Sequence, residues 1–183
     1  PPPSIYQILT ILLNNDFIFD TLSDIIVLST ICKSITTKNI NPYVKQIVIK
    51  TSTFVNIVEL ERFANLEILD IRICENVSGL LYLTNLKILN ITNCNKITTI
   101  TPLYHLTKLQ ILNMSGCYNI TDITTLYNLT NLHTLDMGGL YNITDITIFY
   151  NLTNLHTLNL SGLYNITNIT TLRGLTNLHT LNL

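Results

Sequence analysis

The 183-residue chain has few charged residues. They make up only 11% of it, with 10 Lys and Arg against 11 Asp and Glu and a net charge of −1, whereas charged residues are about a quarter of a typical soluble domain. A balance so close to neutral provides neither a basic surface for phosphate backbones nor a polybasic anchor for a membrane surface. We therefore expect neither a nucleic-acid partner nor a membrane partner.

Long apolar runs and a dense set of cysteines are also missing. Runs such as 11–13 and 25–28 are far shorter than the roughly 18–20 residues of a membrane-spanning helix. Four cysteines are too few for a disulfide framework. The first residues, 1–4, lack the basic region and cleavage site of a secretory signal. Because 47% of the residues are hydrophobic, we expect a folded protein. The missing signal and disulfide framework lead us to expect it in the cytoplasm.

The sequence is dominated by an internal repeat. The motif Leu-Thr-Asn-Leu recurs at 83–86, 129–132, 152–155 and 175–178, and Leu-Thr-Lys-Leu stands at 106–109. The units follow the pattern L-x-x-L-x-L-x-x-C/L-x-x-I-T-x-I and start at 44, 66, 86, 109, 132, 155 and 178, and the first of them is degenerate. A period of 20–23 residues predicts a solenoid in which stacked coils share one core.

In these motifs the sequence resembles the leucine-rich-repeat family, with features of its cysteine-containing and internalin-like classes. The resemblance implies an α/β solenoid, a horseshoe with a parallel sheet on its concave face and short 3₁₀ or irregular convex segments. It assigns residues 43–183 to about seven units, the last one truncated. The helical spacing of apolar residues within 4–36 predicts a small helical N-terminal region over residues 1–42. Since the truncated unit has no polar cap, we expect the sequence to be a fragment.

The residues support the same architecture. Alternation at Leu112 and Met114, and again at Leu135 and Met137, has the period of a strand with these side chains inward. The convex segments, about a dozen residues each, are too short for a full α-helix, which favours 3₁₀ turns. Three cysteines share one inward position with two later leucines, and we interpret them as small buried hydrophobes: Cys74, Cys94 and Cys117, followed by Leu140 and Leu163.

The repeat template places four columns of side chains on the concave face, where leucine-rich repeats usually bind. The first column holds Glu67, Lys87, Gln110, His133, His156 and His179, and the second holds Ile68, Ile88, Ile111, Thr134, Thr157 and Thr180. The third holds Asp70, Asn90, Asn113, Asp136, Asn159 and Asn182, and the fourth holds Arg72, Thr92, Ser115, Gly138 and Ser161. Small polar surfaces of this kind suit a protein partner better than a small molecule. We predict a protein-binding site made of Gln110, Asn113, Ser115, His133, Asp136, His156, Asn159, Ser161 and His179.

We predict no catalytic residue, no cofactor and no metal site. The three histidines of the first column could share a zinc ion, but stacked strands point them in one direction and no acidic residue joins them. Clustered histidines could also make the face sensitive to pH. No phosphate-binding glycine loop, carboxylate pair or nucleophile with a base is present, so we do not expect an enzyme.

The N-terminal segment has helical patterning and allows two interpretations. The stretch 22–33, ending in Ile31-Cys32-Lys33, resembles the C-terminal half of an F-box, although Ile35 stands where that motif has tryptophan. The resemblance implies a Skp1-type adaptor bound through Ile26 and Val27, and hence a substrate adaptor of a cullin ubiquitin ligase. The alternative is a helical cap over the first coil. A secreted internalin-like adhesin is a third interpretation, and an interaction scaffold with an unidentified protein partner is the leading one.

Overall fold

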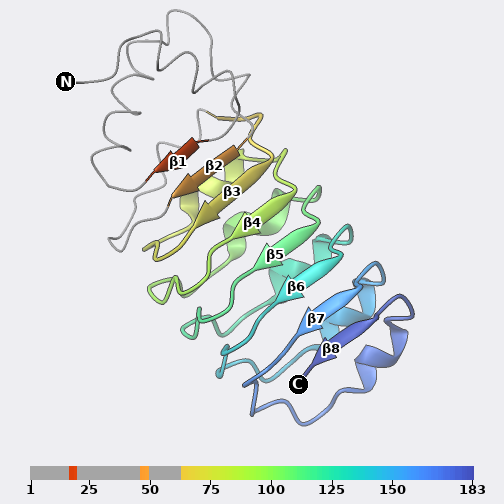
Figure 1. The fold of residues 1–183 in the computed structure, drawn as a ribbon. Helices are drawn as coiled ribbons and strands as arrows, with labels where there is room; N and C mark the ends of the chain where they lie inside the picture. Colours follow the sequence, from red (N-terminus) through yellow and green to blue (C-terminus); the bar gives the residue numbers. More distant parts are fainter. Residues whose placement is uncertain (1–16, 20–45, 50–62) are drawn as a thin grey trace, which may run out of the picture.

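The computed structural model describes residues 17–19, 46–49 and 63–183, the first two segments by their backbone except for Gln46. Eight short strands form one parallel sheet whose spatial order is the order of the chain. The strands are β1 (Phe17–Phe19), β2 (Gln46–Ile49), β3 (Ile68–Ile71), β4 (Ile88–Asn90), β5 (Ile111–Asn113), β6 (Thr134–Asp136), β7 (Thr157–Asn159) and β8 (Thr180–Asn182). Figure 1 shows them side by side along the length of the molecule. The leucine-rich-repeat architecture expected from the sequence is confirmed.

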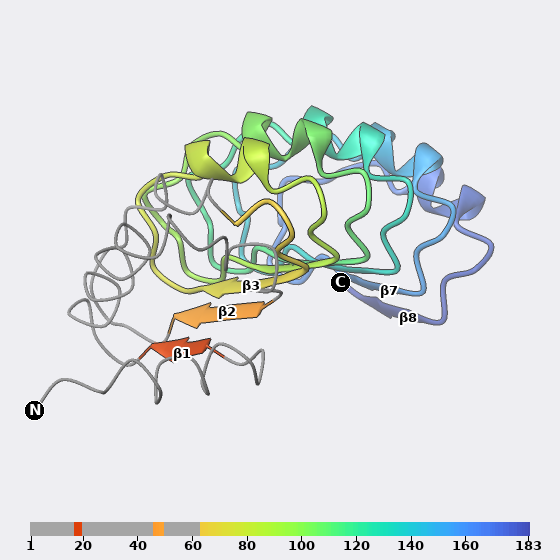
Figure 2. The same cartoon turned by 90° about the horizontal axis from the view of Figure 1, so that it is seen from above.

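Short 3₁₀ helices cover the opposite side of the coils. They are η3 (Ser78–Tyr82), η4 (Thr101–His105), η5 (Thr124–Asn128), η6 (Thr147–Asn151) and η7 (Thr170–Gly174). Figure 2 shows the strands along one side and these helices along the other, joined by the rising and descending segments of each coil. Each helix ends where the amide of a leucine, as at Leu129, donates to the carbonyl three residues earlier. The predicted short convex segments are therefore correct.

The strand register follows the repeat template throughout. Leu112 pairs with Leu135, and Leu135 pairs with Leu158, so equivalent residues stand in line. The degenerate first unit obeys the same rule, since Ile47 pairs with Leu69. One described segment departs from the predicted helical pattern of the N-terminal region. Phe17–Phe19 form β1 beside β2, because a Phe-Ile-Phe run has high strand propensity and meets the open edge of a parallel sheet.

The core is a continuous column of apolar side chains between the strands and the convex helices. Leu112, Met114 and Cys117 are fully buried, as are Ile120 and Leu126 on the other side of the same coil. No polar or charged side chain is buried among the described residues. The inward positions predicted from the alternation, including those of the three cysteines, are thus confirmed.

Asparagine side chains join one coil to the next at two corners. At the first corner, the side-chain amides of Asn131, Asn154 and Asn177 donate to carbonyls of the preceding coil at 2.8–2.9 Å. Asn119, Asn142 and Asn165 make the same bond at 2.7–2.8 Å on the other side of the sheet. The Asn of Leu-Thr-Asn-Leu therefore satisfies backbone carbonyls that turn away from the sheet.

Each coil from β3 to β7 turns sharply just after its strand, through a residue with positive φ. The later coils have glycine there, at Gly116, Gly139 and Gly162, with φ of 73–79°. The earlier coils have Ile73 at 66° and Asn93 at 60°. Because a β-branched residue is strained in this region, Ile73 is a poor occupant of a position that favours glycine.

The first prediction concerns the strand register. Leu135→Ala should lower the free energy of unfolding by about 2–5 kcal/mol, because it leaves a cavity in a fully buried column. Thr134→Ala, on the neighbouring half-exposed position, should cost much less. Urea denaturation of both variants measures the difference, and equal losses would place the strand one residue out of register.

The second prediction concerns the turn. Gly139→Ala should destabilise by about 1–2 kcal/mol, because an L-residue there is strained at φ 77° although its Cβ would have room. Ile73→Gly should raise the urea midpoint by removing that strain. Gly174→Ala is the matched control: its Cβ would contact nothing within 4 Å, so its stability should stay unchanged or rise. If Gly139→Ala behaves like the control, the positive-φ requirement is wrong.

Candidate functional site

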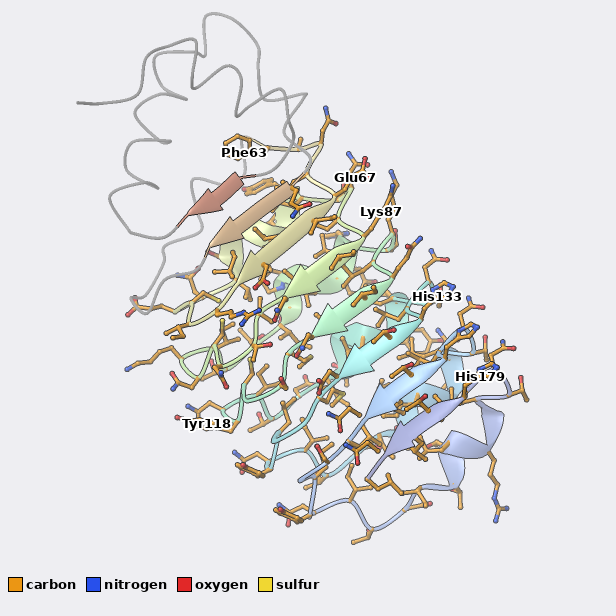
Figure 3. The ribbon with its side chains drawn as sticks, viewed as in Figure 1. Phe63, Glu67, Lys87, Tyr118, His133 and His179 are labelled. Atoms are coloured by element: carbon orange, nitrogen blue, oxygen red, sulfur yellow. The ribbon has the colours of Figure 1, made fainter. Side chains whose placement is uncertain are left out.

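The concave face of β3–β8 holds the predicted protein-binding residues, but its columns differ in how they lie. The first column follows one edge of the sheet, where the strands begin: Figure 3 shows Glu67, Lys87, His133 and His179 along this edge. Tyr118 lies at the opposite edge, beyond the strand ends. The second and third columns lie on the sheet itself, at the first and third residues of β5–β8. The first column is therefore the rim of the face.

The histidines of the first column form a regular stack. Adjacent rings of His133, His156 and His179 have centroids 5.3 Å apart and are nearly parallel, at 14° and 2°. Each Nδ1 lies 2.6–2.8 Å from the carbonyl oxygen two residues earlier. Since a carbonyl only accepts, Nδ1 carries the proton, and Nε2 of the neutral ring is left as an acceptor. The rim thus presents an ordered row of imidazoles.

The first column carries a charged pair at its N-terminal end, and the neighbouring columns carry another. Lys87 Nζ lies 2.7 Å from Glu67 Oε2, and Arg72 Nε lies 3.3 Å from Asp70 Oδ1. Each pair neutralises itself locally. The concave face therefore has no strong field of either sign at this end of the described coils.

The third column holds its turns together. The Oδ1 atoms of Asn113, Asp136 and Asn159 accept the backbone N–H two residues later, at 2.9–3.0 Å. Asn159 also donates to Asp136 across the strands at 2.9 Å. These predicted binding residues are half-buried, and a substitution at any of them would disturb the turn as well as the surface.

The threonine side chains of the second column do not bind the turns in this way. Within the described residues, the hydroxyls of Thr134, Thr157 and Thr180 make no hydrogen bond. Ile111 is 37% exposed, although it is a large apolar residue on a strand. The predicted site omitted this column. One feature of the sequence points to this column: the same outward strand position is isoleucine in the earlier coils and threonine in the later ones.

The three cysteines meet inside the coils, beneath this face. Cys74 Sγ lies 2.8 Å from Cys94 Sγ, and the Cys74 amide donates to the Cys94 sulfur at 3.0 Å. The neighbouring thiols of Cys117 and Cys74 lower the pKa of Cys94. The neighbouring Cys94 sulfur, together with burial, raises the pKa of Cys74 and of Cys117. The sulfurs therefore interact, which simple hydrophobic filling would not require.

The described residues contain no group of three histidine, cysteine or acidic side chains arranged to hold a metal ion. The same residues contain no helix long and apolar enough to cross a membrane. Ile26 and Val27, the residues predicted to bind an adaptor, lie outside the described residues.

Comparisons with known proteins agree with the coil geometry. A family model described as leucine-rich repeats in two copies matches residues 107–151. No curated protein sequence matches significantly. Internalin C2 of Listeria monocytogenes has a similar structure, with 26% identity and a TM-score of 0.59, and the match covers 79% of this chain and 65% of internalin C2.

Two less identical structures show the fold alone. The leucine-rich-repeat domain of the type III effector XopL matches with 23% identity and a TM-score of 0.55, over 66% of this chain and 43% of that domain. The TLR13 protein of a TLR13–ssRNA13 complex matches with 20% identity and a TM-score of 0.60, over 91% of this chain and 23% of TLR13. The chain thus spans less than two thirds of each of these three proteins. Its 23-residue repeats, its parallel sheet and these likenesses show that this chain has a leucine-rich-repeat fold.

Proposed function

We propose that the chain is a non-catalytic scaffold that binds a protein partner on the concave face of β3–β8. The observation that carries the proposal is the second column, a row of outward side chains on these six strands, of which Thr134, Thr157 and Thr180 make no side-chain hydrogen bond among the described residues. Leucine-rich repeats are commonly interaction scaffolds and generally non-catalytic, which supports this class of function.

The chemistry of the face favours a protein over other ligands. Its N-terminal half offers isoleucine side chains beside two self-neutralised ion pairs, and its C-terminal half offers threonine hydroxyls beside the histidine rim. Apolar anchors with adjacent small polar groups match the composition of protein interfaces. A nucleic acid would need clustered positive charge, and the chain has a net charge of −1. The face extends over six adjacent strands, β3–β8, and a protein partner can contact all of them at once.

The first and second columns would make different contacts with the partner. Ile68, Ile88 and Ile111 would bury apolar area against the partner, and such buried anchors dominate binding energy. The histidines at the rim would accept hydrogen bonds through Nε2. The third column, with Asn113, Asp136 and Asn159, would contribute mainly by fixing the shape of the face.

The N-terminal region keeps both of its interpretations. We still predict that residues 1–42 form either an F-box or a cap, and that an F-box would bind a Skp1-type adaptor through Ile26 and Val27. The domain boundary at residue 43 and the cytoplasmic location are also predictions. The internalin-like adhesin also stays a prediction. The similarity to internalin C2 concerns the repeats that both chains share.

The third prediction tests the concave face directly. Thr134→Arg and Thr157→Arg place a bulky cation in the second column without removing an internal hydrogen bond, so the fold should remain intact while binding is lost. A partner captured by the wild-type chain from its native lysate, and then purified, should bind each variant about tenfold or more weaker. Binding can be measured by calorimetry.

The convex face supplies the control. Thr147→Arg changes an exposed side chain of η6, whose backbone amide still donates to Asp145, and it should leave affinity unchanged. Urea midpoints of all three variants separate lost binding from lost folding. If Thr147→Arg weakens binding and the concave variants do not, the partner binds elsewhere and the proposal is wrong.

A further inference from the structure

Three thiols stand in one column inside neighbouring coils, and the proposed function uses none of them. Cys74, Cys94 and Cys117 are each fully buried, and all three are free cysteines. Cys94 occupies the middle coil of the three: its sulfur accepts a hydrogen bond from the Cys74 thiol at 2.8 Å, while the Cys117 thiol donates to the Ile91 carbonyl at 3.0 Å. The later coils have leucine at this position, at Leu140 and Leu163. Within the described part of the chain, the sulfur contacts are therefore confined to three successive coils.

We propose that Cys74 and Cys94 are an oxidisable pair, which a peroxide converts into a disulfide between two adjacent coils. The cross-link would join residues 20 positions apart in the sequence. It would tie the first fully described coil to the second.

The geometry of the coils suits this bond. Cys74 and Cys94 each stand four residues beyond a paired strand residue, Asp70 in β3 and Asn90 in β4. Adjacent parallel strands are about 4.8 Å apart, and disulfide-bonded cysteines have Cα atoms roughly 4.4–6.8 Å apart. The sulfurs already touch at 2.8 Å, so a small shift brings them to bonding distance. Cys74 and Cys94 share one template position and lie on the same side of their coils.

The surroundings of Cys94 favour its thiolate, which is the reactive form. The Cys74 amide and the Cys74 thiol both donate to its sulfur, at 3.0 and 2.8 Å, and the neighbouring thiols of Cys117 and Cys74 lower its pKa. Cys94 is therefore the sulfur that reacts first with a peroxide, and Cys74 is the resolving thiol beside it.

The reaction takes two steps. The Cys94 thiolate attacks one peroxide oxygen, the O–O bond breaks, and Cys94 sulfenic acid and hydroxide are formed. The Cys74 sulfur then attacks the Cys94 sulfur, the S–OH bond breaks, and the Cys74 thiol proton leaves with that hydroxyl as water. Two sulfurs are oxidised and one peroxide is reduced, so the electrons balance.

Burial makes the pair selective. Both cysteines are fully buried, so a small oxidant enters more easily than a bulky aromatic disulfide reagent. We expect hydrogen peroxide to oxidise the pair in the folded chain under conditions in which the bulky reagent does not titrate it.

The fourth prediction tests the pair by peptide mapping. The full chain, carrying Cys32→Ser, is treated with hydrogen peroxide, denatured, alkylated and digested. We expect a cross-linked peptide that joins Cys74 to Cys94, loss of two free thiols per chain, and a higher urea midpoint that a reducing agent reverses.

Two matched variants serve as controls, because each truncates one buried thiol of the same column. Cys94→Ala should abolish the cross-link, while Cys117→Ala should retain it. Circular dichroism checks that both fold; if Cys94→Ala does not, the peptide map of the parent chain decides alone. The proposal is overturned if folded chains give no 74–94 cross-link, whether the thiols stay free, oxidise only to sulfonic acid or pair between molecules.

Discussion

Stacking of apolar side chains between successive coils is the interaction on which the rest of the structure depends. A single coil of about 23 residues cannot enclose its own leucines, whereas neighbouring coils bury them completely, as at Leu112, Leu135 and Leu158. This requirement fixes the register, because equivalent residues must lie in line for the column to fill. It also places the outward residues of every coil in line, and so creates the columns of the concave face.

Polar groups form hydrogen bonds between the coils that this stacking has already placed side by side. Strand amides bind the neighbouring strand, and the corners are closed by asparagine amides such as Asn154 to Thr130 at 2.9 Å. Asn119, Asn142 and Asn165 also lie in Asn-Ile-Thr sequences typical of glycosylation acceptors. Their side-chain nitrogens already donate to the preceding coil, so the frequency of this sequence has a structural explanation.

The repeat sequence predicts the fold in detail because one period determines both burial and register. The inward leucines, the buried cysteines and the short convex helices all follow from it. Other features depend on contacts between coils that a one-dimensional pattern does not contain. Strand β1 needed a neighbouring edge, and the sulfur contact between Cys74 and Cys94 needed the actual spacing of two side chains. The strain at Ile73 became visible only with its backbone angle of 66°.

The candidate site shows the same division. The template placed Asn113, Asp136 and Asn159 on the outward side, yet their oxygens are committed to their own turns. A residue that holds a turn has little freedom to vary with a partner. Under the proposed function, specificity must therefore come from the isoleucines and threonines of the second column, and from the Nε2 atoms of the rim histidines, whose Nδ1 atoms are bound to their own backbone. The first and second columns can change residue type from coil to coil while the stacked core beneath them stays the same.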